Sequence, residues 1–351
     1  MAEEIQRRQR RVRYKGTHPR PFAERYKELD PERHAQELDK VRARGDTPAG
    51  THRPICVQEV LEALDPQPGD IGLDATLGFG GHAQEILPRL RPDGRLFGID
   101  VDPVELPRTE ARLRGLGFGE DILVIRRMNF AGLRRLRPEV GSGLDFVLAD
   151  LGVSSMQLDN PARGFTYKAN GPLDLRFNPG QGRPASALLR TLTEAALVDL
   201  LVENADEPYA SAIAHALHGQ PVATTVHLAD RVRCALTVVV PTADHPQETR
   251  KALQRTFQAL RIAVNDEFRA LDQFLAQLPD CLTPGGRVAI LSFHSGEDRR
   301  VKKAFQAGHR DGAYARIASD PIRPSADERR ANPRSSSAKL RWAVKAAFSS
   351  D

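Results

Sequence analysis

A glycine-rich turn and a downstream acid are the first residues in this sequence whose types and spacing could do chemistry. The turn reads Leu77-Gly-Phe-Gly-Gly-His82 and follows a short apolar segment, and Asp100 comes 22 residues after Gly78. Glycines let a backbone approach a ligand closely, and an acid at this distance can bind the two hydroxyls of a ribose. The spacing therefore predicts a nucleoside-binding site formed by the turn and Asp100.

Two classes of nucleoside cofactor fit such a turn. A nicotinamide dinucleotide favours the spacing GxGxxG, in which helix N-terminal amides hold a pyrophosphate, but the third glycine of that spacing is missing here. Asp74, at the end of the preceding apolar segment, suits a ligand with an ammonium group, such as the methionine part of S-adenosylmethionine. The turn favours a methyltransferase and leaves a nicotinamide-dependent oxidoreductase open.

Apolar and helical segments alternate around this turn. Strands are predicted at 71–75, 95–99, 121–126 and 144–149, and helices at 83–90 and 107–116. Such alternation predicts an α/β fold with a parallel, doubly wound, Rossmann-like sheet. Ligands of these folds bind beyond the carboxyl ends of the strands, where Asp100 and Asp150 would end the second and fourth strands.

The alternation stops after the fourth strand. Residues 159–180 are rich in Gly, Pro and Asn and are predicted to form an ordered loop. A capping box at Thr191–Glu194 is predicted to open a helix to about residue 202. Further helices are predicted at 208–217 and 226–236, with one long amphipathic helix at 249–278.

Strands at 287–292 and 339–344 are predicted to resume the sheet. We therefore expect a discontinuous core made of residues 51–158 and 265–351. A helical insertion at 159–264 would recognise the substrate, and a basic extension at 1–50 would precede the core.

Composition and charge narrow the functional classes. The chain has 351 residues and a formal net charge of +5, with 7 Lys/Arg against 2 acids in residues 1–20 and 13 against 4 in residues 299–345. Basic ends around an acidic middle predict a polyanionic partner. No apolar run approaches the roughly 18 residues that cross a bilayer, and the N-terminus has no apolar signal segment.

Disulfide and metal chemistry are not indicated. The three cysteines lie far apart in sequence and form no CxxC pair, which suits a reducing cytoplasm. His215 and His218 are one helical turn apart, but no carboxylate or cysteine completes a metal-site pattern. We expect a cytoplasmic protein without a metal.

Three further motifs make the assignment specific. They are Asp150-Leu-Gly-Val-Ser-Ser-Met-Gln-Leu-Asp159, Arg255-Thr-Phe-Gln-Ala-Leu-Arg-Ile262 and Ser292-Phe-His-Ser-Gly-Glu-Asp-Arg299. Together with Asp74-Ala-Thr-Leu-Gly-Phe-Gly-Gly-His82, they resemble the MraW/RsmH family over residues 51–345. The resemblance implies a class I S-adenosylmethionine-dependent methyltransferase with a helical insertion, which N4-methylates a cytosine in the decoding region of 16S small-subunit ribosomal RNA.

Matched position by position, the resemblance also implies a set of cofactor contacts. They are Gly80, Gly81, His82, Asp100, Phe130, Asp150 and Gln157, in addition to Asp74 and Gly78 of the glycine-rich turn. The sequence departs from the commoner family pattern in its N-terminal extension, in Gly296, where a bulkier residue is usual, and in residues 203–209. These departures leave methylation of another RNA site, or a non-catalytic rRNA-binding assembly factor, as alternatives.

Asp150 and His294 are the candidate catalytic residues. The lone pair of cytosine N4 is delocalised into the ring, so a hydrogen-bond acceptor on the amine favours its attack on the methyl group. Asp150, or a backbone carbonyl near Gly152, is predicted to be this acceptor, with Ser154 and Ser155 shaping the pocket. His294 is predicted to contact the base or to relay its proton.

Aromatic and basic side chains are predicted to recognise the RNA. Phe165, Tyr167 and Phe293 are candidates for stacking on an extruded base, and Gln258, Arg261 and Asn265 share a helix face predicted to look toward the active site. Phosphate contacts are predicted from Arg299, Arg300, Lys302, Lys303, Arg329, Arg330 and Arg334. The expected partner is 16S rRNA or the assembled small subunit and no membrane, with a homodimer left open.

Overall fold

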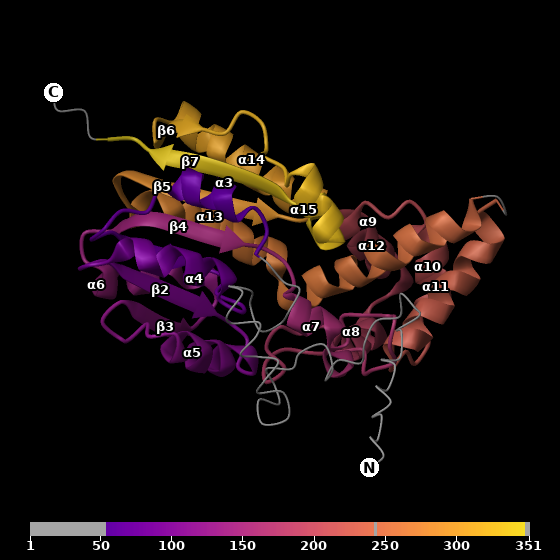
Figure 1. The fold of residues 1–351 in the computed structure, drawn as a ribbon. Helices are drawn as coiled ribbons and strands as arrows, with labels where there is room; N and C mark the ends of the chain where they lie inside the picture. The colour runs from indigo at the N-terminus through magenta and orange to yellow at the C-terminus, as the bar shows by residue number, and fades with distance from the viewer. Residues whose placement is uncertain (1–53, 242–243, 348–351) are drawn as a thin grey trace, which may run out of the picture. The chain divides into compact units, whose positions relative to one another are not determined.

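The computed structural model describes residues 54–241 and 244–347, which contain a seven-stranded sheet (Figure 1). The strand order is β3-β2-β1-β4-β5-β7-β6. Strands β1 to β5 run parallel to one another, as the sequence predicts. Their bounds are β1 Ile71–Asp74, β2 Arg95–Asp100, β3 Leu123–Arg127, β4 Leu144–Asp150 and β5 Leu282–Ser292.

Two antiparallel strands, β7 and β6, extend the sheet beyond β5. β7 (Lys339–Lys345) pairs antiparallel with β5, and β6 (Tyr314–Ile317) pairs antiparallel with β7. The sheet that the sequence predicts to be parallel is thus parallel from β1 to β5 and antiparallel beyond β5. The sequence did not predict β6, because its two middle residues are exposed and give it no apolar pattern.

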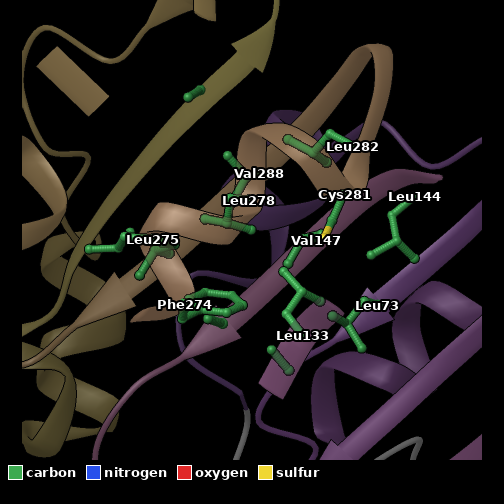
Figure 2. Close-up of a cluster of buried hydrophobic side chains, with 14 of the residues drawn as sticks. Leu73, Leu133, Leu144, Val147, Phe274, Leu275, Leu278, Cys281, Leu282 and Val288 are labelled. Carbon is green, nitrogen blue, oxygen red and sulfur yellow. The ribbon is translucent and has the colours of Figure 1, made fainter. Parts of the chain in front are cut away.

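Strand side chains alternate between two buried faces, as the period of two in a strand requires. Val147 and Val288 point toward α13 (Glu267–Cys281), as Figure 2 shows. Phe146 and Ala289 pack into the cluster on the opposite face. Burial on both faces is the reason that these strands appear in the sequence as continuous apolar runs.

Helices supply the covering layers of the sheet. The face of Val147 is covered by η3, α6, α13 and α14, and the opposite face by α3, α4, η2 and α5. Their bounds are α3 Val57–Leu64, α4 Gly81–Ile86, η2 Leu87–Leu90, α5 Glu105–Gly115, η3 Phe130–Leu136, α6 Arg137–Val140 and α14 Ser295–Arg310. The helices predicted at 83–90 and 107–116 are confirmed, the first as α4 followed by η2.

The helices between β4 and β5 enclose a hydrophobic cluster of their own, which includes Leu201, Ile213, Leu228 and Leu260. In Figure 1, α9 to α12 lie to the right of the sheet. The bounds are α7 Ser155–Asp159, η4 Pro161–Arg163, α8 Ala185–Thr191, α9 Glu194–Ala205, α10 Ala210–Leu217, α11 Thr225–Val239 and α12 His245–Asn265.

The start of α9 corrects one prediction. Thr193, not Thr191, is the N-cap, because its hydroxyl accepts the Ala196 N–H at 3.2 Å. Thr191 is instead the last residue of α8, a helix that the sequence analysis did not predict.

The long helix predicted at 249–278 is two helices, α12 and α13. Asp266 separates them with a left-handed backbone, φ 51° and ψ 40°. The Asn265 side chain accepts the Phe177 N–H at 2.8 Å and donates to the Leu175 carbonyl at 2.7 Å. The break was invisible in the sequence because the apolar spacing continues across it.

The predicted basic extension, residues 1–50, lies outside the described residues. Among the helices that are described, α15 (Ala326–Ala331) and η5 (Pro333–Ser337) precede β7. None of the described helices is long and apolar enough to span a membrane.

Candidate active site

Three predicted acids end neighbouring strands at one edge of the sheet. Asp74 is the last residue of β1, Asp100 of β2 and Asp150 of β4. β1 pairs with both of the other strands, so the three strand ends lie side by side. The carboxyl edge of a parallel sheet is where such folds bind ligands, and here it carries three carboxylates.

Backbone amides hold the Asp100 carboxylate in place. Its Oδ2 accepts the Gly78 N–H at 2.8 Å and its Oδ1 accepts the Asp102 N–H at 2.9 Å. The Thr109 hydroxyl donates to the Gly78 carbonyl at 2.6 Å. Burial raises the pKa of Asp100, although the hydrogen bonds from the Asp102 and Gly78 amides lower it. Gly78, whose φ is 50°, therefore connects the glycine-rich turn to Asp100, the acid that is predicted to bind the ribose.

Gly80 and Gly81 are required for a reason that differs from the expected one. Gly80 has φ 73°, and a Cβ there would meet Leu113 Cδ1 of α5 at 3.0 Å. A Cβ on Gly81 would meet Pro54 Cγ at 2.7 Å. The missing side chains therefore let the turn pack against the protein, whereas the sequence analysis expected room for the ligand.

His82 lies beside Asp150 and is almost fully buried. Its Nε2 lies 3.0 Å from the Ile55 carbonyl, which can only accept, so Nε2 carries the proton and Nδ1 is unprotonated in the neutral ring. Nδ1 lies 3.6 Å from Asp150 Oδ2. Burial lowers the pKa of His82, and the nearby Asp74 opposes this shift.

Two of the acids at this edge are poised to change protonation near neutral pH. Burial raises the pKa of Asp74 to about 7 against the attraction of His82. Burial, with the nearby Glu297 charge, raises the pKa of Asp150 to about 7, although the Asp150 side chain is 30% exposed. Asp150 Oδ1 is buried and has no hydrogen-bond partner among the described residues.

Gln157 is buried in a network that the sequence analysis did not foresee. Its Nε2 donates to Asp102 Oδ2 at 2.7 Å, and its Oε1 accepts the Ser154 N–H at 3.0 Å. Arg163 also donates to Asp102 Oδ2, at 2.8 Å. Asp102 was missed, although its place two residues after Asp100 could have drawn attention to it.

Phe130 follows β3 and packs on the α13 side. Its ring centroid lies 5.1 Å from that of Phe274, with an angle of 59° between the ring planes. The contact with Phe274 is core packing. Phe130 is only partly buried, so part of its ring stays accessible.

His294 is the N-cap of α14. Its Nδ1 accepts the Glu297 N–H at 3.4 Å, and its Nε2 lies 3.1 Å from Glu297 Oε1. The Phe293 N–H donates to the other oxygen of Glu297 at 2.8 Å. Burial would raise the pKa of Glu297, but His294, Arg261 and the Phe293 N–H together hold it below its usual value.

Of the predicted helix face, only Arg261 approaches this group. It binds Glu267 through two nitrogens, at 2.8 and 2.9 Å, and lies 4.0 Å from Glu297. Gln258 instead donates to the Asn204 carbonyl, and Asn265 holds the 175–177 segment. Glu267 and Glu297 were missed, although Glu297 lies inside one of the recognised motifs.

Most of the predicted stacking and phosphate-binding residues have contacts within the protein. Phe165 stacks on Phe177 and Tyr167 packs on Phe257. Four of the predicted arginines lie in ion pairs with acids: Arg299 with Asp206, Arg300 with Asp272, Arg330 with Asp327 and Arg334 with Asp159. Lys302, Lys303 and Arg329 are exposed.

Gly296, a departure from the family pattern, has a steric reason. A Cβ at this position would lie 2.6 Å from Phe268 Cζ. The Phe268 ring also carries the Arg300 guanidinium at 3.9 Å from its centroid. The Phe268 ring of α13 therefore occupies the space that a side chain at position 296 would need.

Two groups of histidine, cysteine or acidic side chains lie close together in the described residues. Glu194 lies 3.3 Å from His215 through Oε1 and 3.8 Å from His218 through Oε2. His215 is 82% exposed in this pair. Cys56, Glu59 and Glu328 also lie within 4.8 Å of one another, in a search restricted to the described residues.

Comparison with known proteins gives one consistent match. Residues 49–346 match the MraW methylase family. Ribosomal RNA small subunit methyltransferase H 2 of Alkaliphilus metalliredigens is 55% identical over 97% of this chain and 99% of its own length. Ribosomal RNA small subunit methyltransferase H 1 of Lachnoclostridium phytofermentans is 51% identical over 96% of this chain and 93% of its own.

The similarity also reaches the N-terminal part of the sequence. An alignment that covers 97% of this chain must include most of residues 1–50, so the Alkaliphilus protein shares the extension. Among solved structures, a putative rRNA methylase from Clostridium thermocellum matches 83% of this chain and 94% of its own length at 10% identity, with a TM-score of 0.40.

Proposed function

Because this chain belongs to the MraW methylase family, we propose that it transfers a methyl group from S-adenosylmethionine to N4 of a cytosine in the decoding region of 16S ribosomal RNA. The names of its relatives support a small-subunit ribosomal RNA substrate. The observation that carries the proposal is the meeting of Asp74, Asp100 and Asp150 at three neighbouring strand ends, beside the glycine-rich turn.

The residues at this edge fit a cationic nucleoside. The buried Asp74, together with the unpartnered Asp150 Oδ1, forms an acidic site that a positively charged ligand would stabilise. Asp100 would hold the ribose, and the accessible part of Phe130 would border the adenine. Gly80 and Gly81, followed by His82, would line the methionine end, and Gln157 would support the site through Asp102.

S-adenosylmethionine supplies a methyl group on a sulfonium, which is a good leaving group. The protein must then orient the cytosine amine and accept its proton. Asp150, at the end of β4, has a side chain that is 30% exposed, and its buried Oδ1 has no hydrogen-bond partner in the described residues. As N4 gains the methyl group it becomes positively charged, and its N–H bond breaks to give the proton to Asp150, whose pKa of about 7 suits this transfer.

We assign His294 to positioning. Its Nδ1 accepts the Glu297 N–H, and its Nε2 is buried 3.1 Å from Glu297 Oε1 without a hydrogen bond in the described residues. Burial keeps both nitrogens from the substrate in this arrangement. Through Glu297 it fixes the Phe293 backbone at the end of β5, next to β4 and Asp150. The predicted contact of His294 with the base is thereby replaced by an indirect role.

We also propose domain limits, a compartment and partners for this chain. The separate hydrophobic cluster between β4 and β5 supports residues 159–264 as an RNA-recognition domain inserted into a core of 51–158 and 265–351. A ribosomal RNA substrate supports action in the cytoplasm, on 16S rRNA or on the assembled small subunit. The homodimer is a proposal that sedimentation analysis of the purified chain would test.

Isothermal titration tests the cofactor class. We expect S-adenosylhomocysteine to bind and NAD to give no heat. Binding of NAD without binding of S-adenosylhomocysteine would contradict the proposal in favour of an oxidoreductase. Binding of S-adenosylhomocysteine without methyl transfer to any RNA would point to the non-catalytic assembly factor.

A further inference from the structure

A cavity of about 290 Å³ lies between η3 and the junction of α12 and α13. Its walls include Asn129 and Arg135 on one side and Arg269 and Gln273 on the other. Asn129 follows the end of β3, and Arg269 lies in the first turn of α13, which leads back toward the start of β5. The cavity is therefore at the same edge of the sheet as the three strand-end acids, on the side of Phe130.

The charge of the lining favours an anion. Arg135 and Arg269 come from different elements and face one cavity, with Asp266 as the single acid among the lining residues. Asp266 lies 3.4 Å from Arg269, and both side chains are mostly exposed, so water screens this pair. Arg135 makes no ion pair within the described part of the chain. Two arginines at one point suit the bidentate geometry of a phosphate.

The two walls are held together before any ligand arrives. Gln277 of α13 donates to the Ala131 carbonyl at 2.7 Å and accepts the Arg134 N–H at 3.0 Å. The Phe130 and Phe274 rings pack between the same two elements. A site whose walls are fixed in advance loses less entropy on binding.

An arginine-rich segment continues the positive charge away from the cavity. Residues 126–137 contain five arginines and no acid. Arg126 pairs with Glu139 and Arg134 with Asp280, whereas Arg127, Arg135 and Arg137 are exposed. The basic C-terminal residues had been expected to carry the phosphate contacts, so this segment is a separate basic surface.

We propose that this cavity is a second RNA subsite, in which Arg135 and Arg269 bind a backbone phosphate of a nucleotide near the target cytosine. The subsite rests on the proposed function, because it needs an RNA substrate. Its volume lies at the lower limit of typical ligand pockets, about 300 Å³, which suits one phosphate and sugar. Small residues, Ala131, Gly132 and Ala270, leave the floor open.

The test is the double variant Arg135→Gln/Arg269→Gln, measured for binding to a small-subunit rRNA fragment at several salt concentrations. Loss of a charge-assisted contact predicts RNA affinity about 10- to 100-fold lower and a salt slope reduced by about 1. Affinity for S-adenosylhomocysteine should not change. The matched control is Arg95→Gln/Arg310→Gln, which removes two exposed arginines at the start of β2 and the end of α14.

A synthetic RNA with single phosphates replaced by neutral methylphosphonates gives the direct readout. One replacement should weaken binding to the wild type and have no effect on the double variant. RNA affinity equal to wild type in the double variant overturns the subsite, and so does a parallel loss of S-adenosylhomocysteine binding. A wild type that neither binds nor methylates RNA would instead contradict the proposed function itself.

Discussion

At the scale of single residues, Asp150 is the most informative side chain. It ends β4, lies 3.6 Å from His82 and keeps one buried oxygen without a hydrogen-bond partner in the described residues. A buried polar atom without a partner is costly in a folded protein. We infer that the substrate amine supplies the missing partner.

Asp150→Asn should separate proton transfer from binding. The amide keeps the shape of the side chain but cannot take up the proton from N4, so the single-turnover rate should fall at least about 100-fold. Affinity for S-adenosylhomocysteine, measured by titration, should change far less. Asp93→Asn, at an exposed position before β2, is the control. A full rate in Asp150→Asn would remove this residue from the chemistry.

Residue types and spacing identified the three strand-end acids because each follows an apolar strand that the sequence shows clearly. The residues that surround Glu297, the partner of His294, were not predictable in this way. Arg261 and Glu267 lie in sequence far from Glu297, and only the packing of α12, α13 and α14 brings them together. Contacts between distant helices leave no pattern in a single sequence.

At the scale of elements, the strand ends make the stability of the ligand-free protein depend on pH. Burial raises the pKa of Asp74 to about 7, from about 4 in an unfolded chain. Between these values the folded state holds a proton that the unfolded state has released, so the stabilisation is complete below about pH 4 and is lost as pH rises through about 7.

Melting temperatures of the wild type and Asp74→Asn, compared across this interval, check the sign. The wild type should lose stability relative to the permanently neutral asparagine variant as pH rises. Parallel curves would mean that the carboxyl of Asp74 titrates normally. Affinity for the cationic S-adenosylmethionine should rise over the same interval, because a cation binds the ionised acid more strongly.

Gly296→Ala tests the packing of α14 on α13. The added Cβ would lie 2.6 Å from Phe268 Cζ, so we expect the free energy of unfolding to fall by about 1–3 kcal/mol. Phe268→Ala should remove the clash, and the double variant should then be more stable than the sum of the two single changes predicts. Additive effects in chemical denaturation would contradict the steric account.

The prediction of elements succeeded where burial imposes a period. The strands β1, β2, β4 and β5 were found because both of their faces are largely buried, and β6 was missed because its middle is exposed. The division of α12 from α13 depends on one residue, Asp266, and on the bonds of Asn265 to a distant loop. The periodicity of the local sequence predicts neither the backbone conformation of Asp266 nor the bonds of Asn265.

At the scale of the whole molecule, the distribution of charge determines how RNA is held. Phosphate binding was predicted for the basic C-terminal residues, but Arg299 and Arg300 form ion pairs with Asp206 and Asp272. Lys302 and Lys303 are exposed on the same helix. Within the described residues these lysines lie beside no acid, whereas an acid beside Arg299 and Arg300 offsets part of the charge of each arginine.

Lys302→Glu/Lys303→Glu should weaken RNA binding more than the matched double variant Arg299→Glu/Arg300→Glu does. Each lost phosphate contact lowers the salt slope by about 1, so the lysine double variant should show a slope reduced by about 2. Filter binding at several salt concentrations measures both quantities. Equal effects of the two double variants would show that the ion pairs with acids do not restrain the two arginines.

The central claim is tested most directly by nucleoside mass spectrometry of small-subunit RNA. RNA from cells that lack this gene is incubated with the purified protein and S-adenosylmethionine carrying a deuterated methyl group. The account predicts that the label appears in N4-methylcytidine from the decoding region, and that Asp150→Asn greatly slows its appearance. Label in another nucleoside, or none in any, would contradict it.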